Sequence, residues 1–271
     1  MSDSPIDDIK ELVLSKPVVP VAIALLIILI TFVFLNRSTL FAKKVEDFVI
    51  IGPKSSGKTN LFSLLTTGKL PKLTVSSIEP SHDKLELGFE GHQLVGSYGI
   101  YDFPSASKLK SLYLYPHLQK NLNHIKGIIY MLDASNFNAE YCHEVASELI
   151  DILEITETYP NGIDISIFCN KCDLFTSKKK LKIRRMLEEQ VSKLYDLRLK
   201  SLSKVSKEGA NEEDDDSETT GLVNSEALSS SFNNGNFLFA LLEGNIDFLE
   251  GNIFKGKYEE VTNWIHEKAV N

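Results

Sequence analysis

Apolar residues along this chain form short uninterrupted runs, and segments with helical spacing lie between them. The apolar runs occur at Val45–Ile51, Gly127–Ala134 and Asp164–Lys171. Runs of this length are typical of strands buried on both faces of a parallel sheet. Helical spacing is found at Ala139–Ile155, from Lys178 onward and at Glu259–Ala269. Strands that alternate with helices in this way predict an α/β, three-layer fold with a mostly parallel central sheet.

The remaining predicted elements are shorter. A helix is predicted after Thr59, and Gly68 is expected to end it in the left-handed conformation that glycine adopts readily. Two further strands, Lys84–Phe89 and Gln93–Tyr101, are expected to be joined through Glu90–His92. The stretch at 236–252 is strand-like.

One apolar run is longer than the others. Val18–Leu35 contains no charged residue and would measure roughly 27 Å as a helix, close to the hydrocarbon thickness of the endoplasmic reticulum membrane. A buried core helix or a signal peptide is the alternative, but no small-residue cleavage site follows the run. We therefore expect a transmembrane helix at 18–35, after a short N-terminus at 1–17. A linker at 36–44 and a folded domain at 45–271 follow.

The charges that flank this run indicate its orientation. Three cations follow it, at Arg37, Lys43 and Lys44, whereas two cations precede it, at Lys10 and Lys16. By the positive-inside rule, the folded domain is expected in the cytosol and the N-terminus in the lumen.

Composition narrows the classes of function. The formal net charge of −8 argues against a protein that binds nucleic acid directly, because such proteins normally present a basic face. The 3 cysteines are too few for a disulfide framework, which fits a reducing compartment. Residues 200–235 carry acidic, serine and asparagine runs with almost no large apolar residues, so we expect a disordered insertion there within the folded domain.

The first candidate for chemistry follows the first predicted strand directly. Residues 52–59 read GPKSSGKT and match G-x-x-x-x-G-K-[ST], a loop that wraps backbone N–H groups around a phosphate at a helix N-terminus. Lys58 would neutralise the β- and γ-phosphate oxygens, and Thr59 would bind Mg²⁺ through its hydroxyl. The predicted nucleotide-binding residues here are Gly52, Pro53, Lys54, Ser55, Ser56, Gly57, Lys58, Thr59 and Asn60.

A second motif ends the third apolar run. Asn170, Lys171 and Asp173 match Asn-Lys-x-Asp, the element that reads guanine. An aspartate carboxylate can accept hydrogen bonds from guanine N1–H and from the exocyclic amine, and adenine has no such pair of donors. The C-x-x-C spacing of Cys169 and Cys172 leaves a metal or redox pair as an alternative, although zinc would need two more ligands.

These motifs occur in the order of the Ras-like small GTPases. Together with the N-terminal apolar run, they make the chain similar to the beta subunits of the signal recognition particle receptor, a family with one transmembrane helix and an Arf/Sar-like GTPase domain. The resemblance covers nearly the whole chain. It rests on the loop at 52–59, Thr-x-x-Ser with Glu-Pro at Thr74–Pro80, Asp-Phe-Pro at Asp102–Pro104, Asn-Lys-x-Asp at Asn170–Asp173, and Phe-Leu-Glu-Gly at Phe248–Gly251.

The resemblance implies further site residues. Thr74 would be the switch I threonine that contacts Mg²⁺ and the γ-phosphate, with Ser76 as the alternative, and Asp102 would hold Mg²⁺ through water. Gly251 and Asn252 would stand in the last guanine-binding loop, where the family usually has a Ser-Ala-type element. The implied cofactors are GTP or GDP with Mg²⁺.

The segment after Asp102 departs from the usual phosphate-sensing element. Ser105 replaces the usual glycine; it keeps the backbone N–H but loses easy access to positive φ. Ala106 stands where Ras-like hydrolases have a glutamine that orients the attacking water, and where the receptor family usually has histidine. We expect hydrolysis to be slow or dependent on a partner, and assign no catalytic residue.

The role implied by the resemblance is that of a switch anchored in the endoplasmic reticulum membrane. Its GTP state would bind the receptor's alpha subunit through that subunit's N-terminal longin-like domain, in co-translational targeting at the ribosome and the translocon. An Arf/Sar-type trafficking GTPase is the first alternative, although Ser2 stands where myristoylation needs glycine. A P-loop ATPase or kinase is the second, and the guanine-reading motif argues against it.

Overall fold

The computed structural model describes residues 24–28, 31, 46–85, 88–89, 92–93, 98–208 and 228–270. The chain divides into two units, Met1–Lys44 and Val45–Asn271, and the second carries the α/β fold. The expected luminal segment, the linker and the expected span at 18–35 lie outside the described residues, apart from helical residues 24–28 and 31. Within the described part of the chain, no helix is both long enough and apolar enough to cross a membrane.

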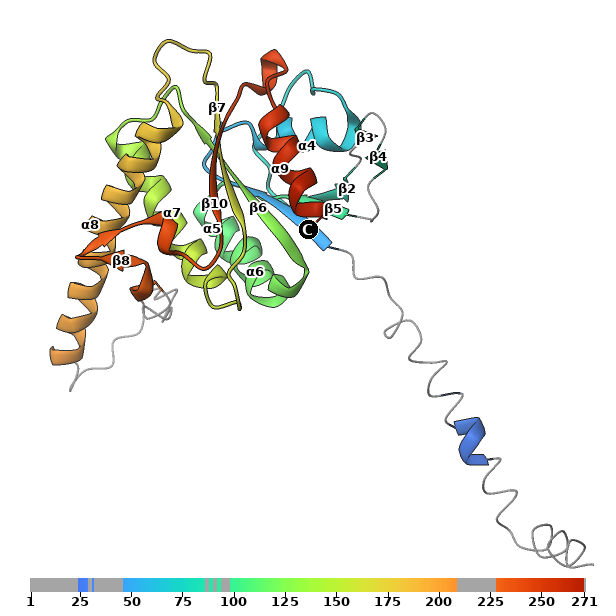
Figure 1. The fold of residues 1–271 in the computed structure, drawn as a ribbon, viewed down its shortest axis with the longest axis horizontal. Coiled ribbons are helices and arrows are strands. Elements are labelled where there is room, and N and C mark those ends of the chain that lie inside the picture. The colour runs from blue at the N-terminus through green and yellow to red at the C-terminus, as the bar shows by residue number, and fades with distance from the viewer. Residues whose placement is uncertain are drawn as a thin grey trace, which may run out of the picture. The chain divides into compact units, whose positions relative to one another are not determined.

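A six-stranded sheet forms the centre of the second unit (Figure 1). Its strands are β1 Glu46–Ile51, β2 Ser81–Lys84, β5 Tyr98–Asp102, β6 Ile125–Asp133, β7 Ile165–Asn170 and β10 Ile246–Glu250. They lie in the order β10-β7-β6-β1-β5-β2, and all neighbours are parallel except β2, which runs antiparallel to β5 at one edge. The predicted α/β class and its mostly parallel central sheet are confirmed.

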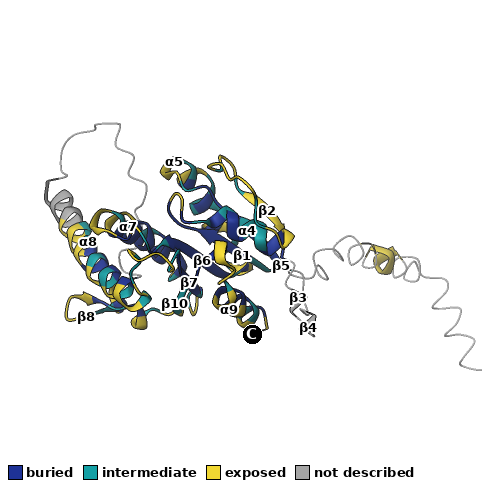
Figure 2. Ribbon diagram, turned by 90° about the horizontal axis from the view of Figure 1, so that it is seen from above, coloured by how far each residue is buried: buried dark blue, intermediate teal, exposed yellow. Residues whose placement is uncertain are grey.

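Helices cover both faces of this sheet. They are α4 Lys58–Thr67, α6 Tyr115–Asn121, α7 Ala139–Thr156, α8 Lys180–Glu208 and α9 Glu259–Val270. Alternate residues of a strand face opposite sides, so Val49 and Ile51 of β1 join one core with α6, α7 and α8, while Phe48 and Ile50 join a second core with α4 and α9. Figure 2 shows the buried residues concentrated in the sheet and on the helix faces that cover it.

The connections carry short elements. They are α5 Ser107–Leu109, a π-helical turn at Lys110–Leu114, 3₁₀ turns at Leu122–His124, Ser229–Ser231, Phe239–Leu241 and Ile253–Lys255, and two ribbons made of β3 Gly88–Phe89 with β4 His92–Gln93 and of β8 Phe232–Asn233 with β9 Asn236–Phe237. The helix predicted after the phosphate-binding loop ends as expected, because Gly68 has a φ of 68° and donates its N–H to the carbonyl of Leu64.

The region between α4 and β5 differs from the prediction. Strands were expected at Lys84–Phe89 and Gln93–Tyr101, whereas β2 ends at Lys84, β5 begins at Tyr98, and the ribbon of β3 and β4 pairs separately from the main sheet. The extent of β5 follows from its parallel pairing with β1. Such pairing between distant segments has no signature in the local sequence, so the strand ends were predicted poorly.

The expected disordered insertion at 200–235 also differs from the structure at both ends. Helix α8 continues to Glu208, residues 209–227 lie outside the described residues, and the chain is folded again from Leu228. Phe237 is buried there and donates its N–H to Ser192 Oγ of α8 at 2.8 Å. Phe232, the one aromatic residue within 200–235, stacks on Tyr195 of α8, so the end of this segment is folded although its average composition is polar.

Candidate functional site

The loop between β1 and α4 needs its glycines. Gly52 and Gly57 have φ angles of 135° and 102°, which residues other than glycine rarely adopt. A Cβ on Gly52 would lie 2.1 Å from the carbonyl oxygen of Met131, and a Cβ on Gly57 would lie 2.6 Å from Asn170 Nδ2. The loop therefore packs against the ends of β6 and β7 with no room for a side chain at either position.

Lys58, the first residue of α4, is buried at the base of this loop. Its Nζ donates to the carbonyl oxygen of Pro53 at 2.8 Å, inside its own loop. Burial lowers the pKa of Lys58 to about 8, while the charge of Asp102 opposes that shift. The ammonium is thus held in a poorly solvated position, where a phosphate would supply a strong counter-charge.

The structure brings Thr59 and Asp102 together from segments far apart in the sequence. Thr59 Oγ1 donates to Asp102 Oδ2 at 2.8 Å, and Asp102 is 1% exposed at the end of β5. Burial raises the pKa of Asp102, and the bond from Thr59 and the charge of Lys58 oppose the shift. Asp102 Oδ1 is buried and has no hydrogen-bond partner among the described residues. A hydroxyl beside a buried carboxylate with one open oxygen is a donor set that fits Mg²⁺ and its water.

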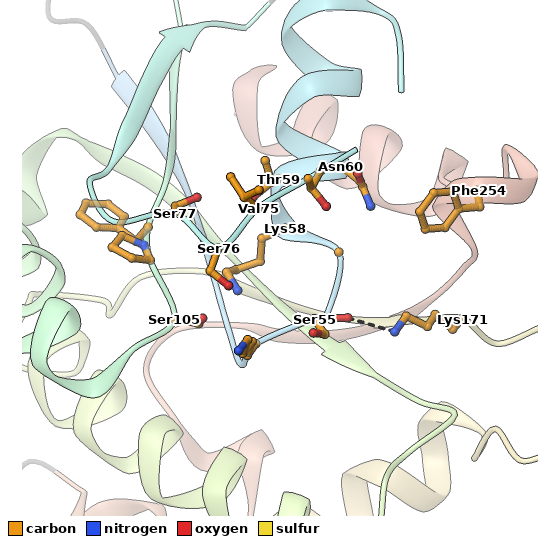
Figure 3. Close-up of a pocket in the computed structure, with 15 residues that line it drawn as sticks. Ser55, Lys58, Thr59, Asn60, Val75, Ser76, Ser77, Ser105, Lys171 and Phe254 are labelled. Atoms are coloured by element: carbon orange, nitrogen blue, oxygen red, sulfur yellow. Dashed lines mark hydrogen bonds between the residues drawn. The ribbon is translucent and has the colours of Figure 1, made fainter. Parts of the chain in front are cut away.

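A cavity of about 250 Å³ opens above the loop (Figure 3). It is lined by Lys54, Ser55, Gly57, Lys58, Thr59, Asn60, Thr74, Val75, Ser76, Ser77, Phe103, Pro104, Ser105, Lys171 and Phe254. Thr74 and Ser76 are both exposed and both reach this cavity, so the structure does not choose between the two predicted switch I ligands. Ser105 reaches it as well, from the segment after β5.

Ser105 and Ala106 differ in their relation to the cavity. Ser105 is not among the described non-glycine residues with positive φ, so the strain considered for it is absent in this conformation. Ala106 is exposed and extended, with a φ of −68°, and does not line the cavity. Its carbonyl accepts hydrogen bonds from the N–H groups of Leu109 and Lys110, both at 2.9 Å, at the start of α5.

Asn170, in the guanine-reading motif, contacts both the phosphate-binding loop and the turn that follows Asn252. This residue is fully buried at the end of β7; its Nδ2 donates to the carbonyl of Ser56 at 2.8 Å, and its Oδ1 accepts from the N–H of Ile253 at 3.2 Å. One amide side chain therefore fastens the phosphate-binding loop on one side and the loop after β10 on the other. Gly57 is required partly because this amide lies against it.

Lys171 lies along the edge of the cavity. It has a φ of 62°, and its Nζ donates to the carbonyl of Ser55 at 2.9 Å and to Asp133 Oδ2 at 2.5 Å. Burial tends to raise the pKa of Asp133, but the bonds from Lys171 and Ser135 leave it below the usual value. The ion pair thus fixes the lysine stem where the cavity ends.

Asp173 has partners on both carboxylate oxygens. Oδ1 accepts from Asn252 Nδ2, and Oδ2 lies 2.7 Å from Lys255 Nζ. The hydrogen bond from Lys255 is the largest cause of a lowered pKa for Asp173. Asp173, Gly251 and Asn252 line a neighbouring hollow of about 550 Å³ rather than the cavity above the phosphate loop. The segment 251–255 contributes residues to both hollows.

The turn that follows Asn252 was not predicted from the sequence. Ile253, Phe254 and Lys255 form a 3₁₀ turn, which Asn252 caps by accepting the N–H of Lys255 at 3.1 Å. Ile253 and Lys255 bond to the predicted residues Asn170 and Asp173, and Phe254 lines the cavity with several others. The Ser-Ala-type element that the family usually has in this loop ends before these three positions, so the resemblance did not indicate them. Their position directly after the predicted Gly251 and Asn252 was the available signal.

The cysteine pair considered as a metal or redox site is placed differently. Cys169 is buried in the core, and Cys172 donates its thiol to the carbonyl of Cys169 at 3.0 Å. Burial raises the pKa of both thiols, which disfavours the thiolate that metal binding requires. No group of three or more His, Cys, Asp and Glu side chains suited to a metal ion occurs among the residues that the structure describes.

Sequence comparisons match the chain to one family. The family model described as "Signal recognition particle receptor beta subunit" matches residues 43–239. The Saccharomyces cerevisiae signal recognition particle receptor subunit beta is 36% identical over 223 residues, which are 82% of this chain and 84% of the yeast protein. The human subunit beta is 26% identical over 174 residues, 64% of this chain and 61% of that protein.

Solved structures share the fold. The mammalian SRP receptor structure has a TM-score of 0.60 at 21% identity, covering 82% of this chain and all of that one. The complex SRb-GTP/SRX from Chaetomium thermophilum has a TM-score of 0.58 at 20% identity, with 82% and 98% covered. The small GTPase Arl6 from Trypanosoma brucei has a TM-score of 0.52 at 16% identity, with 83% and 97% covered. The chain has the small GTPase fold and belongs to the signal recognition particle receptor beta subunit family.

Proposed function

We propose that the chain is a membrane-anchored switch that binds GTP or GDP with Mg²⁺. The observation that carries this proposal is Asn170, which bonds to Ser56 of the phosphate-binding loop and to Ile253 of the last loop. It joins a phosphate-binding element to a guanine-reading element in one rigid unit. A relative from Chaetomium thermophilum has been solved as SRb-GDP-Mg, which supports the same cofactors here.

The predicted phosphate-binding and magnesium-binding residues have separate roles in this proposal. Backbone N–H groups of the loop at 52–58 would hold phosphates, and Lys58 would exchange its bond to Pro53 for a phosphate oxygen. Thr59 and Asp102, with Thr74 or Ser76, would hold Mg²⁺, which neutralises phosphate charge when it is bound.

Asp173 is proposed to select guanine. Replacing Asp173 with asparagine exchanges an acceptor for a donor, so preference should move from GTP toward xanthosine triphosphate, whose ring offers the complementary acceptor. Competition between the two nucleotides against a fluorescent guanine nucleotide measures this preference. Full guanine selectivity in the Asp173→Asn variant would contradict the role of Asp173 in selecting guanine. The P-loop ATPase or kinase alternative would then have to be considered again.

The proposed partner is the receptor's alpha subunit, bound through its N-terminal longin-like domain in the GTP state. Membership in the family and the SRb-GTP/SRX complex of a relative support this partner. Purified full-length chain in detergent, loaded with GTP or GDP, is mixed with the purified alpha-subunit domain or with coat components. GTP-dependent binding of the alpha-subunit domain is expected, whereas binding of coat alone would favour an Arf/Sar-type trafficking role.

We also propose that the run Val18–Leu35 anchors the chain in the endoplasmic reticulum membrane, with the GTPase domain in the cytosol and close to the ribosome and translocon. The flanking cations and the family support this topology. Added protease should digest the GTPase domain of intact microsomes. Protection of that domain would contradict the cytosolic placement.

Hydrolysis is proposed to be slow without a partner. Ala106 has no group that could orient water, and it does not line the cavity. Single-turnover hydrolysis of GTP by the full-length chain alone, with and without the alpha-subunit domain, tests this. A rate typical of an assisted GTPase from the chain alone would contradict the proposal.

A further inference from the structure

We propose that Phe254 forms a wall for the purine base and is a residue on which nucleotide affinity depends. This inference rests on the proposed nucleotide-binding function and adds a residue to it. Phe254 is 62% exposed and lines the cavity above the phosphate loop, together with Lys171. Figure 3 shows both side chains on the same side of the cavity, away from Ser105.

Residues on both sides of Phe254 are bonded to the guanine-reading motif. The N–H of Ile253 donates to Asn170 Oδ1 at 3.2 Å, and Lys255 Nζ lies 2.7 Å from Asp173 Oδ2. Asn252 donates its side-chain amide to the other oxygen of Asp173. The phenyl ring is therefore carried on a turn fastened to both ends of Asn170–Asp173, in the segment 251–255 that contributes to the cavity of Phe254 and to the hollow of Asp173.

The turn itself is held in one conformation. Asn252 accepts the N–H of Lys255 at 3.1 Å, and its backbone pairs with Lys257 through hydrogen bonds of 2.8 and 2.9 Å. Gly256 ends the turn with a φ of 72°, in the left-handed region. An aromatic ring on a fixed turn costs less conformational entropy on binding than one on a mobile loop would.

Lys171 is proposed to form the second wall of the base site, facing Phe254 across the base. Its ammonium is held by the carbonyl of Ser55 and by Asp133, so its methylene stem lies fixed along the cavity edge. A planar base can pack between an aliphatic stem and a phenyl ring, because both present apolar surface to its faces. Asp173 would then read the edge of the same base.

Exposure alone does not single out Phe254, since isolated apolar residues are common on protein surfaces. Phe175 provides the contrast: it is fully exposed and lies only two residues after Asp173, yet it does not line the cavity. The two phenylalanines thus form a matched pair, one in the cavity wall and one outside it.

The test uses the full-length chain in detergent micelles with Mg²⁺. GDP affinity is measured by calorimetry for the wild type, Phe254→Ala, Phe254→Tyr and Phe175→Ala. Phe254→Ala removes the stacking of the base on the ring, so it should lower GDP affinity about 5- to 100-fold. Phe254→Tyr keeps the ring and should bind within about threefold of wild type, and Phe175→Ala should be unchanged.

A ligand without a base separates stacking from a general defect. Pyrophosphate, measured as a competitor of a fluorescent GDP, should bind Phe254→Ala as it binds wild type. Equal losses for GDP and pyrophosphate, or unchanged GDP affinity in Phe254→Ala, would overturn the inference while leaving the proposed function intact. Failure of the wild-type chain to bind GDP would overturn the proposed function and this inference with it.

Discussion

The ammonium of Lys110 lies 2.7 Å from Glu148 Oε1, and both side chains are almost completely buried. Glu148 stands on α7, and its other oxygen accepts the hydroxyl of Tyr130 from β6 at 2.9 Å. Lys110 begins the π-helical turn that follows α5, eight residues after Asp102. The buried pair therefore fastens the segment next to the nucleotide cavity to the core of the domain.

Removing one partner of this pair should be strongly destabilising. Glu148→Gln leaves a buried ammonium without a counter-charge, which typically costs roughly 3–5 kcal/mol of unfolding free energy. Urea unfolding measures the loss. Replacing both residues together, Lys110→Met with Glu148→Leu, should recover most of it because no buried charge remains. A loss below about 1 kcal/mol in Glu148→Gln would mean that the pair is solvated.

Lys58 should oppose folding while it serves binding. Its pKa of about 8 means that its charge is disfavoured in the folded state, so Lys58→Met should raise the unfolding free energy at pH 7 by about 1–3 kcal/mol and abolish GDP binding. Below pH 8 the lysine is charged in both folded and unfolded chains, so the full penalty applies.

The pH dependence provides the check. Between pH 8 and the ordinary lysine pKa of 10.5, only the unfolded chain keeps the proton on Lys58, so wild type gains stability relative to Lys58→Met as pH rises. Denaturant unfolding at pH 7 and pH 9.5 compares the two chains. A difference that does not shrink with rising pH would contradict the depressed pKa.

Gly57→Ala should abolish nucleotide binding because it distorts the phosphate-binding loop, while helix α4 stays folded. An added Cβ would lie 2.6 Å from Asn170 Nδ2 at a φ of 102°, so the bond from Asn170 to Ser56 has to break. Gly68→Ala is the matched control, because Gly68 also has positive φ but no atom within 4 Å of an added Cβ. Both should lose about 1 kcal/mol of stability from backbone strain. Gly57→Ala should lose further stability from the broken hydrogen bond, and it alone should lose GDP binding. Calorimetry with GDP that finds equal affinities would refute the role of this contact.

Lys255 should keep Asp173 ionised at low pH. Its hydrogen bond lowers the pKa of Asp173, so in Lys255→Met that pKa should rise and GDP affinity should begin to fall at a higher pH than in wild type. Measuring GDP affinity from pH 7 down to pH 4 shows the pH at which binding begins to weaken, and Lys257→Met, at an exposed lysine, is the control. Tighter GDP binding in Lys255→Met would show instead that Lys255 competes with the base.

Much of the nucleotide-binding framework was predictable because it is local. The loop at 52–59 needs glycines at fixed positions, a lysine and a hydroxyl, and the buried strands before it and at Gly127–Ala134 read as apolar runs. Composition was less reliable, since the average polarity of 200–235 concealed Leu228 and Phe232, which pack into the core where the chain is folded again.

Residue types at short, regular spacing suffice to predict the class of fold, the phosphate-binding loop and the guanine-reading motif. It takes the folded chain to show that Asn170 joins Ser56 to Ile253, that Phe254 reaches the cavity, and that Lys110 meets Glu148. These contacts join residues dozens of positions apart or more. Those of Asn170 and Phe254 arise where parallel strands bring their carboxyl ends to one edge of the sheet, whereas Lys110 meets Glu148 where the turn after α5 packs against α7. The spacing of residues along the chain does not indicate which distant segments will pack together.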